Sequence, residues 1–210
     1  MTFFLWSQFA IVCLLGAMSP GPSLALIIRN SININRMSGI MASIAHGLGI
    51  CLYATVTVIV LEFILTNSEL IFFVIQICGS LFLIILGLIF VFKKNNENHI
   101  ETYQVYSSSF TQGFIIAIIN PKILIWFTAI FSQFIDINAS LLNKTILVLT
   151  PSIIDAIWYS LVTILVTGYG LKEILNKKKF MIQKIIGILL IIIAFSLVYS
   201  LIRSNFFDHF

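Results

Sequence analysis

Long stretches without charge dominate this sequence and decide what it can fold into. A helix needs about 20 mostly apolar residues to cross the hydrocarbon core of a bilayer. Because lipid offers the backbone no hydrogen-bond partners, each such stretch is expected to be helical. Only 10% of the residues are charged, against about 25% in a typical soluble domain. The sequence therefore predicts an all-α membrane protein in a lipid bilayer, with six transmembrane helices over Phe3 to Ile28, Gly39 to Leu61, Leu70 to Phe92, Phe110 to Ile135, Thr145 to Leu171 and Ile185 to Ile202.

Basic residues lie between alternate stretches, and this pattern predicts how the helices are oriented. Arg29 and Arg36 follow the first stretch, whereas the opposite side holds only Lys144 and Arg203. More basic residues follow the third and fifth stretches, namely Lys93, Lys94, Lys172, Lys177, Lys178, Lys179 and Lys184. Cytoplasmic loops of membrane proteins carry an excess of Lys and Arg. These segments, including the polar loop 93–109, are therefore expected in the cytoplasm, with both termini outside.

Several other classes of function find no support in the sequence. The net charge of +4 comes from loops between apolar runs, which suits an anionic membrane surface rather than nucleic acid. Cys13, Cys51 and Cys78 lie in separate apolar runs without a CxxC or Cys/His cluster, so no disulfide, metal site or cofactor is expected. No HExxH motif, catalytic triad spacing or pair of catalytic carboxylates is visible. We therefore expect a protein that is not an enzyme.

A weak internal repeat divides the chain into two halves. Phe9 to Pro20 and Phe110 to Pro121 each contain Phe, ten residues and then Pro, and the residue before each Pro is a good helix cap. Three spans in each half would place the second half in the opposite orientation, which is the inverted-repeat plan of many secondary transporters. A chance match of two prolines is the alternative. The expected units are one domain over 1–210, with repeat one at about 3–92 and repeat two at about 110–203.

Both repeats place proline inside an apolar run, where it should break the helix. Pro20 and Pro22 lack a backbone donor, and each disfavours helical geometry in the residue before it. We expect the first helix to break near Ser19 and to restart with Ser19 as N-cap and Pro20 in the first position, while Gly21 permits a turn. In the fourth span, Asn120 and Pro121 are expected to play the same two parts. The plainer alternative is a simple kink in each helix.

Lys122 follows the second break and adds a cation within an apolar run. A charge at such depth costs about 3 kcal/mol on insertion scales, so it is expected to have a partner or a function. The N-termini of the two half-helices also carry free N–H groups and partial positive charge. Together these groups predict a site for an anion such as an α-carboxylate. The alternative is that Lys122 extends to the membrane interface.

Two further ionisable residues lie inside predicted spans. Asp155 is expected to pair with Lys122, to bind a substrate ammonium or to carry a proton, and Tyr159 follows it by one helical turn. His46 in the second span is interpreted first as a hydrogen-bonded packing residue and second as a proton relay. Gly39 and Gly47, with Ser43 between them, recur every four residues. Such a stripe is typical of helices that approach each other closely.

These motifs together resemble the LysE/RhtB family of amino acid exporters. The matching pieces are Ser19-Pro20-Gly21-Pro22, Arg36-x-x-Gly39 with Gly47, the run from Gly113 to Asn120-Pro121-Lys122, and Asp155-Ala-Ile-Trp158-Tyr159. The resemblance covers almost the whole chain. It implies a carrier of the bacterial inner membrane that exports amino acids or close derivatives, driven by protons, and it does not fix the substrate. Ser23 departs from the family pattern, since many relatives have Asn there.

The sequence and the resemblance together nominate a set of site residues. Those expected to bind substrate are Ser19, Pro20, Gly21, Pro22, Ser23, Asn120, Pro121, Lys122, Asp155 and Tyr159, and those expected to couple protons are Asp155 and His46. The expected partners are a small amino acid, protons and lipid, and a homo-oligomer is left open. The rival interpretations are an exporter of another small solute or metal ion, a channel, and a membrane assembly subunit without transport activity.

Overall fold

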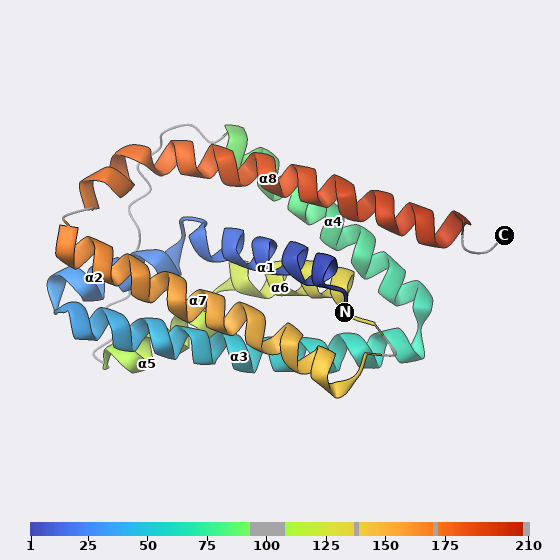
Figure 1. Cartoon of the computed structure of the whole chain (residues 1–210), viewed down its shortest axis with the longest axis horizontal. Coiled ribbons are helices and arrows are strands. Elements are labelled where there is room, and N and C mark those ends of the chain that lie inside the picture. The colour runs from blue at the N-terminus through green and yellow to red at the C-terminus, as the bar shows by residue number, and fades with distance from the viewer. Residues whose placement is uncertain (93–107, 137–138, 170–171, 208–210) are drawn as a thin grey trace.

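The computed structural model describes residues 1–92, 108–136, 139–169 and 172–207, and every regular element in these ranges is helical (Figure 1). In chain order the elements are α1 (Phe3–Met18), α2 (Pro22–Asn33), α3 (Arg36–Asn67), α4 (Glu69–Phe92), α5 (Ser109–Ile119), α6 (Pro121–Phe134), α7 (Leu141–Tyr169) and α8 (Lys172–Phe207). The prediction of an all-α protein is confirmed for the described residues. The predicted loop 93–109 lies almost entirely outside them.

Three helices of the described residues are long and apolar enough to cross a membrane. They comprise Arg36–Asn67, Leu70–Phe92 and Leu141–Gly168. The pair α1 and α2 passes the same test together, with a bend of 60° between them, and counts as a fourth span if it crosses the membrane as one unit. The remaining apolar helices among the described residues are shorter, namely Ser109–Ile119, Ile125–Phe134 and Lys184–Tyr199. The first two are short because the fourth predicted span is divided at Asn120. The layout of six spans therefore remains a prediction.

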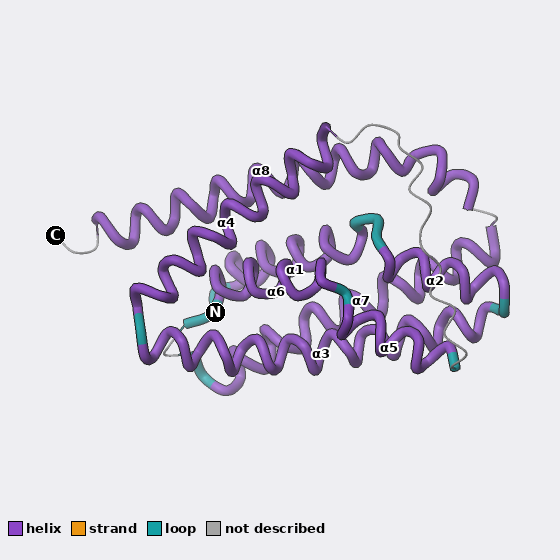
Figure 2. Tube along the Cα trace, turned by 180° about the vertical axis from the view of Figure 1, so that it is seen from behind, coloured by secondary structure: helices purple, strands orange, loops and turns teal. Residues whose placement is uncertain are grey.

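The helices form two packed pairs with a third layer between them. Helix α3 packs along α7 and α5, and α4 packs along α8 and α6. Helices α1 and α6 lie between the pair formed by α3 and α7 and the pair formed by α4 and α8 in both views (Figures 1 and 2). The turn between α2 and α3 and the beginning of α8 lie at one end of the molecule, whereas α1 begins towards the other end, where α8 stops (Figure 1).

Small residues allow the long helices to approach closely. A Cβ atom on Gly47 of α3 would lie 2.7 Å from the Cβ of Ala156 on α7. A Cβ on Gly87 of α4 would lie 2.8 Å from the carbonyl oxygen of Gly187 on α8. A Cβ on Gly187 would lie 2.6 Å from the carbonyl oxygen of Gly87. Such distances leave no room for a side chain. The packing interpretation of the small-residue stripe is therefore confirmed at Gly47.

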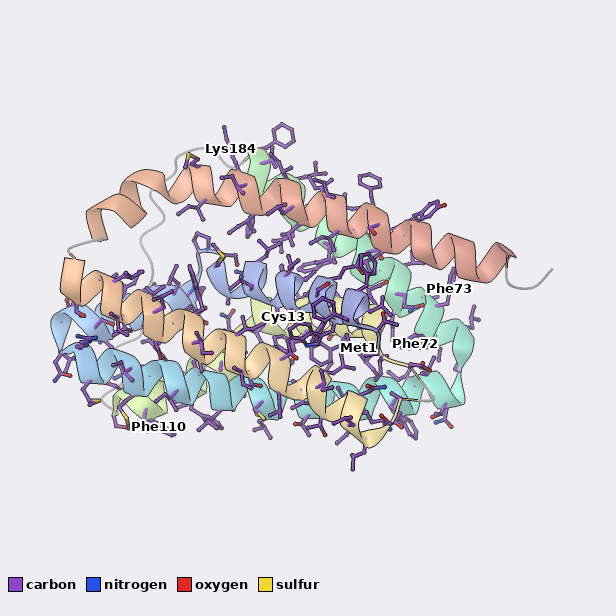
Figure 3. The ribbon with its side chains drawn as sticks, in the orientation of Figure 1. Met1, Cys13, Phe72, Phe73, Phe110 and Lys184 are labelled. Atoms are coloured by element: carbon purple, nitrogen blue, oxygen red, sulfur yellow. The ribbon has the colours of Figure 1, made fainter. Side chains whose placement is uncertain are left out.

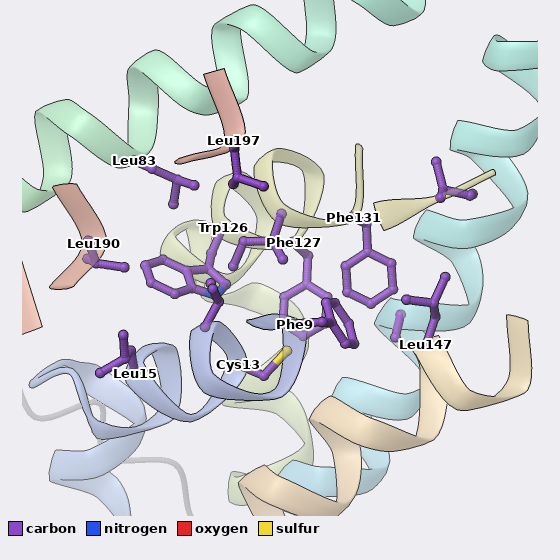
Figure 4. Packing of buried hydrophobic residues seen from close by; sticks show 14 of the residues in the cluster. Phe9, Cys13, Leu15, Leu83, Trp126, Phe127, Phe131, Leu147, Leu190 and Leu197 are labelled. Atoms are coloured by element: carbon purple, nitrogen blue, oxygen red, sulfur yellow. The ribbon is translucent and has the colours of Figure 1, made fainter. Parts of the chain in front are cut away.

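Aromatic side chains fill the interior between the pairs, and aliphatic side chains cover the outside. Phe9 of α1 meets Phe131 of α6 edge to face at 5.3 Å between ring centroids, and Phe127 stacks on Phe131 at 5.1 Å (Figure 4). Many large apolar side chains point outward (Figure 3), among them Ile59 and Phe63 on α3. A contiguous apolar exterior of this extent suits lipid rather than water.

Candidate functional site

The first helix breaks where the sequence predicts, but it restarts one proline later. Helix α1 ends at Met18, and Ser19 is its C-cap, with its N–H bonded to the carbonyl of Leu15 at 3.0 Å. Helix α2 begins at Pro22, with Gly21 as N-cap. The prediction that Ser19 is the N-cap and Pro20 the first helical residue is therefore wrong. The reason is that Pro22 disfavours helical geometry at the residue before it, so the helix cannot begin until Pro22 itself.

This late restart leaves the N-terminus of α2 without a side-chain cap. Gly21 makes no side-chain hydrogen bond to the first turn, and the first backbone bond runs from the N–H of Ala25 to the carbonyl of Gly21 at 3.1 Å. The N–H groups of Ser23 and Leu24 precede that bond and have no acceptor within the helix. The end of α2 therefore offers N–H donors and positive partial charge to a ligand.

The second break follows the prediction closely. Asn120 is the N-cap of α6 and Pro121 its first residue. The side-chain oxygen of Asn120 accepts a hydrogen bond from the N–H of Lys122 at 3.1 Å, and its carbonyl accepts from the N–H of Ile123 at 3.0 Å. The first turn of α6 is thus already satisfied by its own cap. The two breaks are consequently unequal, and only the end of α2 remains open.

Side chains join the two breaks across the interior. The amide nitrogen of Asn120 donates to the hydroxyl of Ser23 at 3.1 Å, and both residues are buried. The ammonium of Lys122 donates to the hydroxyl of Ser19 and, at 3.4 Å, to its carbonyl. The same ammonium lies 5.8 Å from the centroid of the Phe90 ring. Lys122 therefore points into the protein at the first break.

Asp155 has a partner that the sequence did not suggest. Its carboxylate oxygen Oδ2 lies 2.5 Å from Nδ1 of His46, with the two residues 7% and 1% exposed. The second ring nitrogen of His46 has no hydrogen-bond partner among the described residues. Tyr159 meets the His46 ring edge to face at 5.0 Å and makes a side-chain hydrogen bond with Ser23. A buried ionisable pair thus lies beside the first break.

One cavity connects these groups. It has a volume of about 50 Å³, which is room for a few water molecules. The predicted site residues that line it are Ser19, Gly21, Ser23, His46, Asn120, Lys122, Asp155 and Tyr159. Pro20 and Pro22 are not among the lining residues, and they act through the backbone that they break.

The rest of the cavity wall is apolar, and none of its residues was predicted from the sequence. It includes Ile50, Ile123, Trp126, Phe127, Ile130 and Phe131. They were missed because a single sequence does not show which face of α6 turns inward. In the described part of the chain, no group of three His, Cys, Asp or Glu side chains could hold a metal ion.

The sequence model of the LysE type translocator family matches residues 14–201. The chain belongs to this family. Its members are transporters, so this chain is a multi-pass membrane transporter and not an enzyme. The family resemblance drawn from the two proline motifs is thereby confirmed.

Individual relatives of this LysE-type translocator are distant. The uncharacterized membrane protein YrhP of Bacillus subtilis is 25% identical over 186 residues, which cover 82% of this chain and 88% of YrhP. A threonine efflux protein of Salmonella typhi is 28% identical over 61% of this chain and 66% of its own length. A leucine efflux protein of Salmonella choleraesuis is 22% identical over 57% and 58%. No solved structure matches the chain.

Proposed function

We propose that this LysE-type translocator exports an amino acid or a close derivative from the bacterial cytoplasm across the inner membrane. The observation that carries the proposal is the cavity between two broken helices, which is lined by a basic residue, Lys122, and an acidic one, Asp155. The two have different partners, Ser19 for Lys122 and His46 for Asp155. An α-amino acid carries one negative and one positive group and would find a partner for each. The efflux proteins among the relatives support the same substrate class.

The α-carboxylate is assigned to the end of α2. The free N–H groups of Ser23 and Leu24 and the ammonium of Lys122 form a site with positive charge on two sides. A Cβ atom on Gly21 would lie 3.6 Å from the Lys122 ammonium nitrogen. Because Gly21 has no side chain, the helix end and the ammonium can reach the same ligand. The carboxylate would replace the Ser19 hydroxyl as a partner of Lys122.

The α-ammonium is assigned to Asp155, and the same residue links export to protons. In the empty carrier, Asp155 pairs with His46. A substrate ammonium would take over the carboxylate when the carrier faces the cytoplasm. A proton entering from outside would neutralise Asp155, weaken its hold on the ammonium and release the substrate. Return of the proton to the cytoplasm would complete the antiport cycle.

Alternating access follows from the inverted-repeat layout, which we propose for all six predicted spans. In this layout α5 to α8 are the counterparts of α1 to α4, and two pairs of counterparts, α3 with α7 and α4 with α8, pack against each other. Such packing supports the proposal, because a pseudo-twofold axis between the halves would pair the counterparts in this way. Both termini would lie outside, because α1 begins and α8 stops towards the end of the molecule opposite the basic turn between α2 and α3.

Two contacts between the halves would open in turn. On one side of the breaks, Phe9 of α1 packs against Phe131 and Phe134 of α6. On the other side, the amide of Asn30 in α2 donates to Gln112 of α5 at 3.2 Å. The first contact would close the outer path and the second the cytoplasmic path. Rocking of the halves would release one contact while the other holds.

Uptake into proteoliposomes tests the proposal. Vesicles that are acidic inside would drive labelled amino acids inward through a proton antiporter. Lys122→Met keeps the length of the side chain but removes its charge, and we expect uptake to fall to background. The matched control is Lys144→Met in α7, whose ammonium pairs with Glu62 away from the cavity, and it should retain uptake.

The outcomes separate the parts of the proposal. Uptake by Lys122→Met at the wild-type rate would refute the carboxylate site. Uptake that does not depend on the pH gradient would refute proton coupling and would leave amino acid exchange as the mode of transport. No uptake of any amino acid by the wild-type carrier, in vesicles where it is folded, would refute the substrate class.

A further inference from the structure

The cavity wall divides into two chemically different regions. The polar region is one connected group, in which Asn120 and Tyr159 both bond Ser23 and Lys122 bonds Ser19. The apolar region belongs to the main hydrophobic cluster of the protein and comprises Cys13, Ile50, Trp126, Phe127, Ile130 and Phe131. A ligand that spans the cavity therefore meets charge at one end and hydrocarbon at the other.

The apolar region offers few hydrogen bonds to a ligand. Its members from α3 and α6 are aliphatic or aromatic, apart from the indole nitrogen of Trp126. The edge of the indole that carries this nitrogen lies against Gly16, since a Cβ there would be 2.7 Å from Nε1. Cys13 adds a thiol, which is a weak donor and acceptor. This region can therefore pack an apolar side chain and offers few partners to polar groups on it.

The carboxylate and the ammonium of a bound amino acid would together engage the charged side chains that line the cavity. Lys122 is assigned to the carboxylate, and the Asp155 and His46 pair to the ammonium. Among the residues that the structure describes, no further Asp, Glu, Lys or Arg lines the cavity. A third charge, on the side chain of a substrate such as lysine or aspartate, would enter the apolar region without a partner. Burying an unpaired charge in this way is strongly unfavourable.

From this division we infer that the translocator selects amino acids with uncharged, apolar side chains. The inference rests on the proposed function and names its substrate class. The sharpest comparison is valine with threonine, because the two have nearly the same shape and differ by a hydroxyl in place of a methyl. An apolar pocket disfavours the added hydroxyl by about 100-fold at most. We expect a preference for valine of about 10- to 100-fold.

Ile50 offers a way to alter this preference. It lies on α3 one turn after His46, is 2% exposed and lines the cavity. Ile50→Thr keeps a β-branched side chain and brings a hydroxyl into the apolar region, so the preference for valine should fall at least several-fold. Ile59→Thr is the matched control, since Ile59 lies on the same helix but is 61% exposed on the outer surface. That control should leave the preference unchanged.

The experiment measures competitive uptake of labelled valine, threonine and lysine by one preparation of proteoliposomes. The ratio of two substrates does not depend on how much carrier is folded, and the wild-type ratio tests the inference even if Ile50→Thr does not accumulate. Strong uptake of valine, weak uptake of threonine and none of lysine is the expected result. Equal uptake of threonine or lysine would overturn the inference while amino acid transport stands. Absence of all three, with uptake of another charged amino acid, would overturn it as well.

Discussion

Asn120 makes two hydrogen bonds with the two ends of one amide, and these can be separated by substitution. Its oxygen caps α6 at the N–H of Lys122, and its nitrogen joins α6 to Ser23 on α2, each at 3.1 Å. Loss of a helix cap costs about 1 kcal/mol, and loss of a buried hydrogen bond costs about as much. We therefore expect Asn120→Ala to lower the free energy of unfolding by about 2 kcal/mol.

A further variant and a double-mutant cycle separate the contribution of the cap from that of the bond to Ser23. Asn120→Ser retains a cap but is too short to reach Ser23, so it should lose only the bond between the helices, about 1 kcal/mol. In a double-mutant cycle of Ser23→Ala with Asn120→Ala, the bond is counted in both single variants, and we expect a coupling energy of about 1 kcal/mol. The bond between Ser23 and Tyr159 cancels in the cycle, because it is lost in both variants that carry Ser23→Ala.

Unfolding in mixed micelles, titrated with dodecyl sulfate and followed by tryptophan fluorescence, gives these free energies. The same variants should transport less substrate, because the bond joins the two breaks at which we propose the carboxylate site. Strictly additive effects of the two alanine substitutions would refute the view that this bond ties the halves together. A loss in Asn120→Ser as large as that in Asn120→Ala would refute the assignment of a separate cap.

The remaining predictions concern packing, the cavity and orientation. Gly47→Leu should lower the free energy of unfolding by at least about 1–3 kcal/mol, because a side chain would force α3 away from α7. A Cβ on Gly168 would meet nothing within 4 Å, so Gly168→Ala should be neutral or slightly stabilising in the same titration. Gly16→Ala should push the Trp126 ring, 2.7 Å from the new Cβ, towards the cavity and slow uptake at equal amounts of reconstituted carrier; an unchanged rate would contradict this. A tag at the C-terminus should be labelled by an impermeant reagent from outside intact cells, and labelling from the cytoplasm alone would reverse the predicted orientation.

Local backbone chemistry made the two breaks predictable. Proline lacks a donor wherever it stands, and an Asn before it is a ready cap. Proline alone does not decide the break, because α7 continues through Pro151; the first break has two prolines with Gly21 between them, and the second has Asn120 as a cap. The predicted restart at Pro20 is wrong because the first break contains two prolines, and the prediction considered only Pro20 as the first helical residue. Weighing the effect of Pro22 on Gly21 would have decided between them.

Contacts between residues far apart in the sequence could not be predicted from local backbone chemistry. His46 and Asp155 are 109 residues apart, and they meet only because Gly47 and Ala156, the next residue on each helix, bring α3 and α7 together. A small residue beside each ionisable one was the available signal. The apolar wall of the cavity was missed for a related reason, since lipid-facing and cavity-facing Phe residues look alike in a membrane helix.

The two charged side chains of the cavity already have partners within the protein. Lys122 rests on Ser19 and Asp155 on His46, so an arriving cargo molecule exchanges partners instead of meeting bare ions. Such an exchange releases little net free energy, and retention of the cargo should therefore be weak. A carrier with such weak binding would transport its substrate slowly at ordinary cytosolic concentrations of that substrate, and faster when the substrate accumulates.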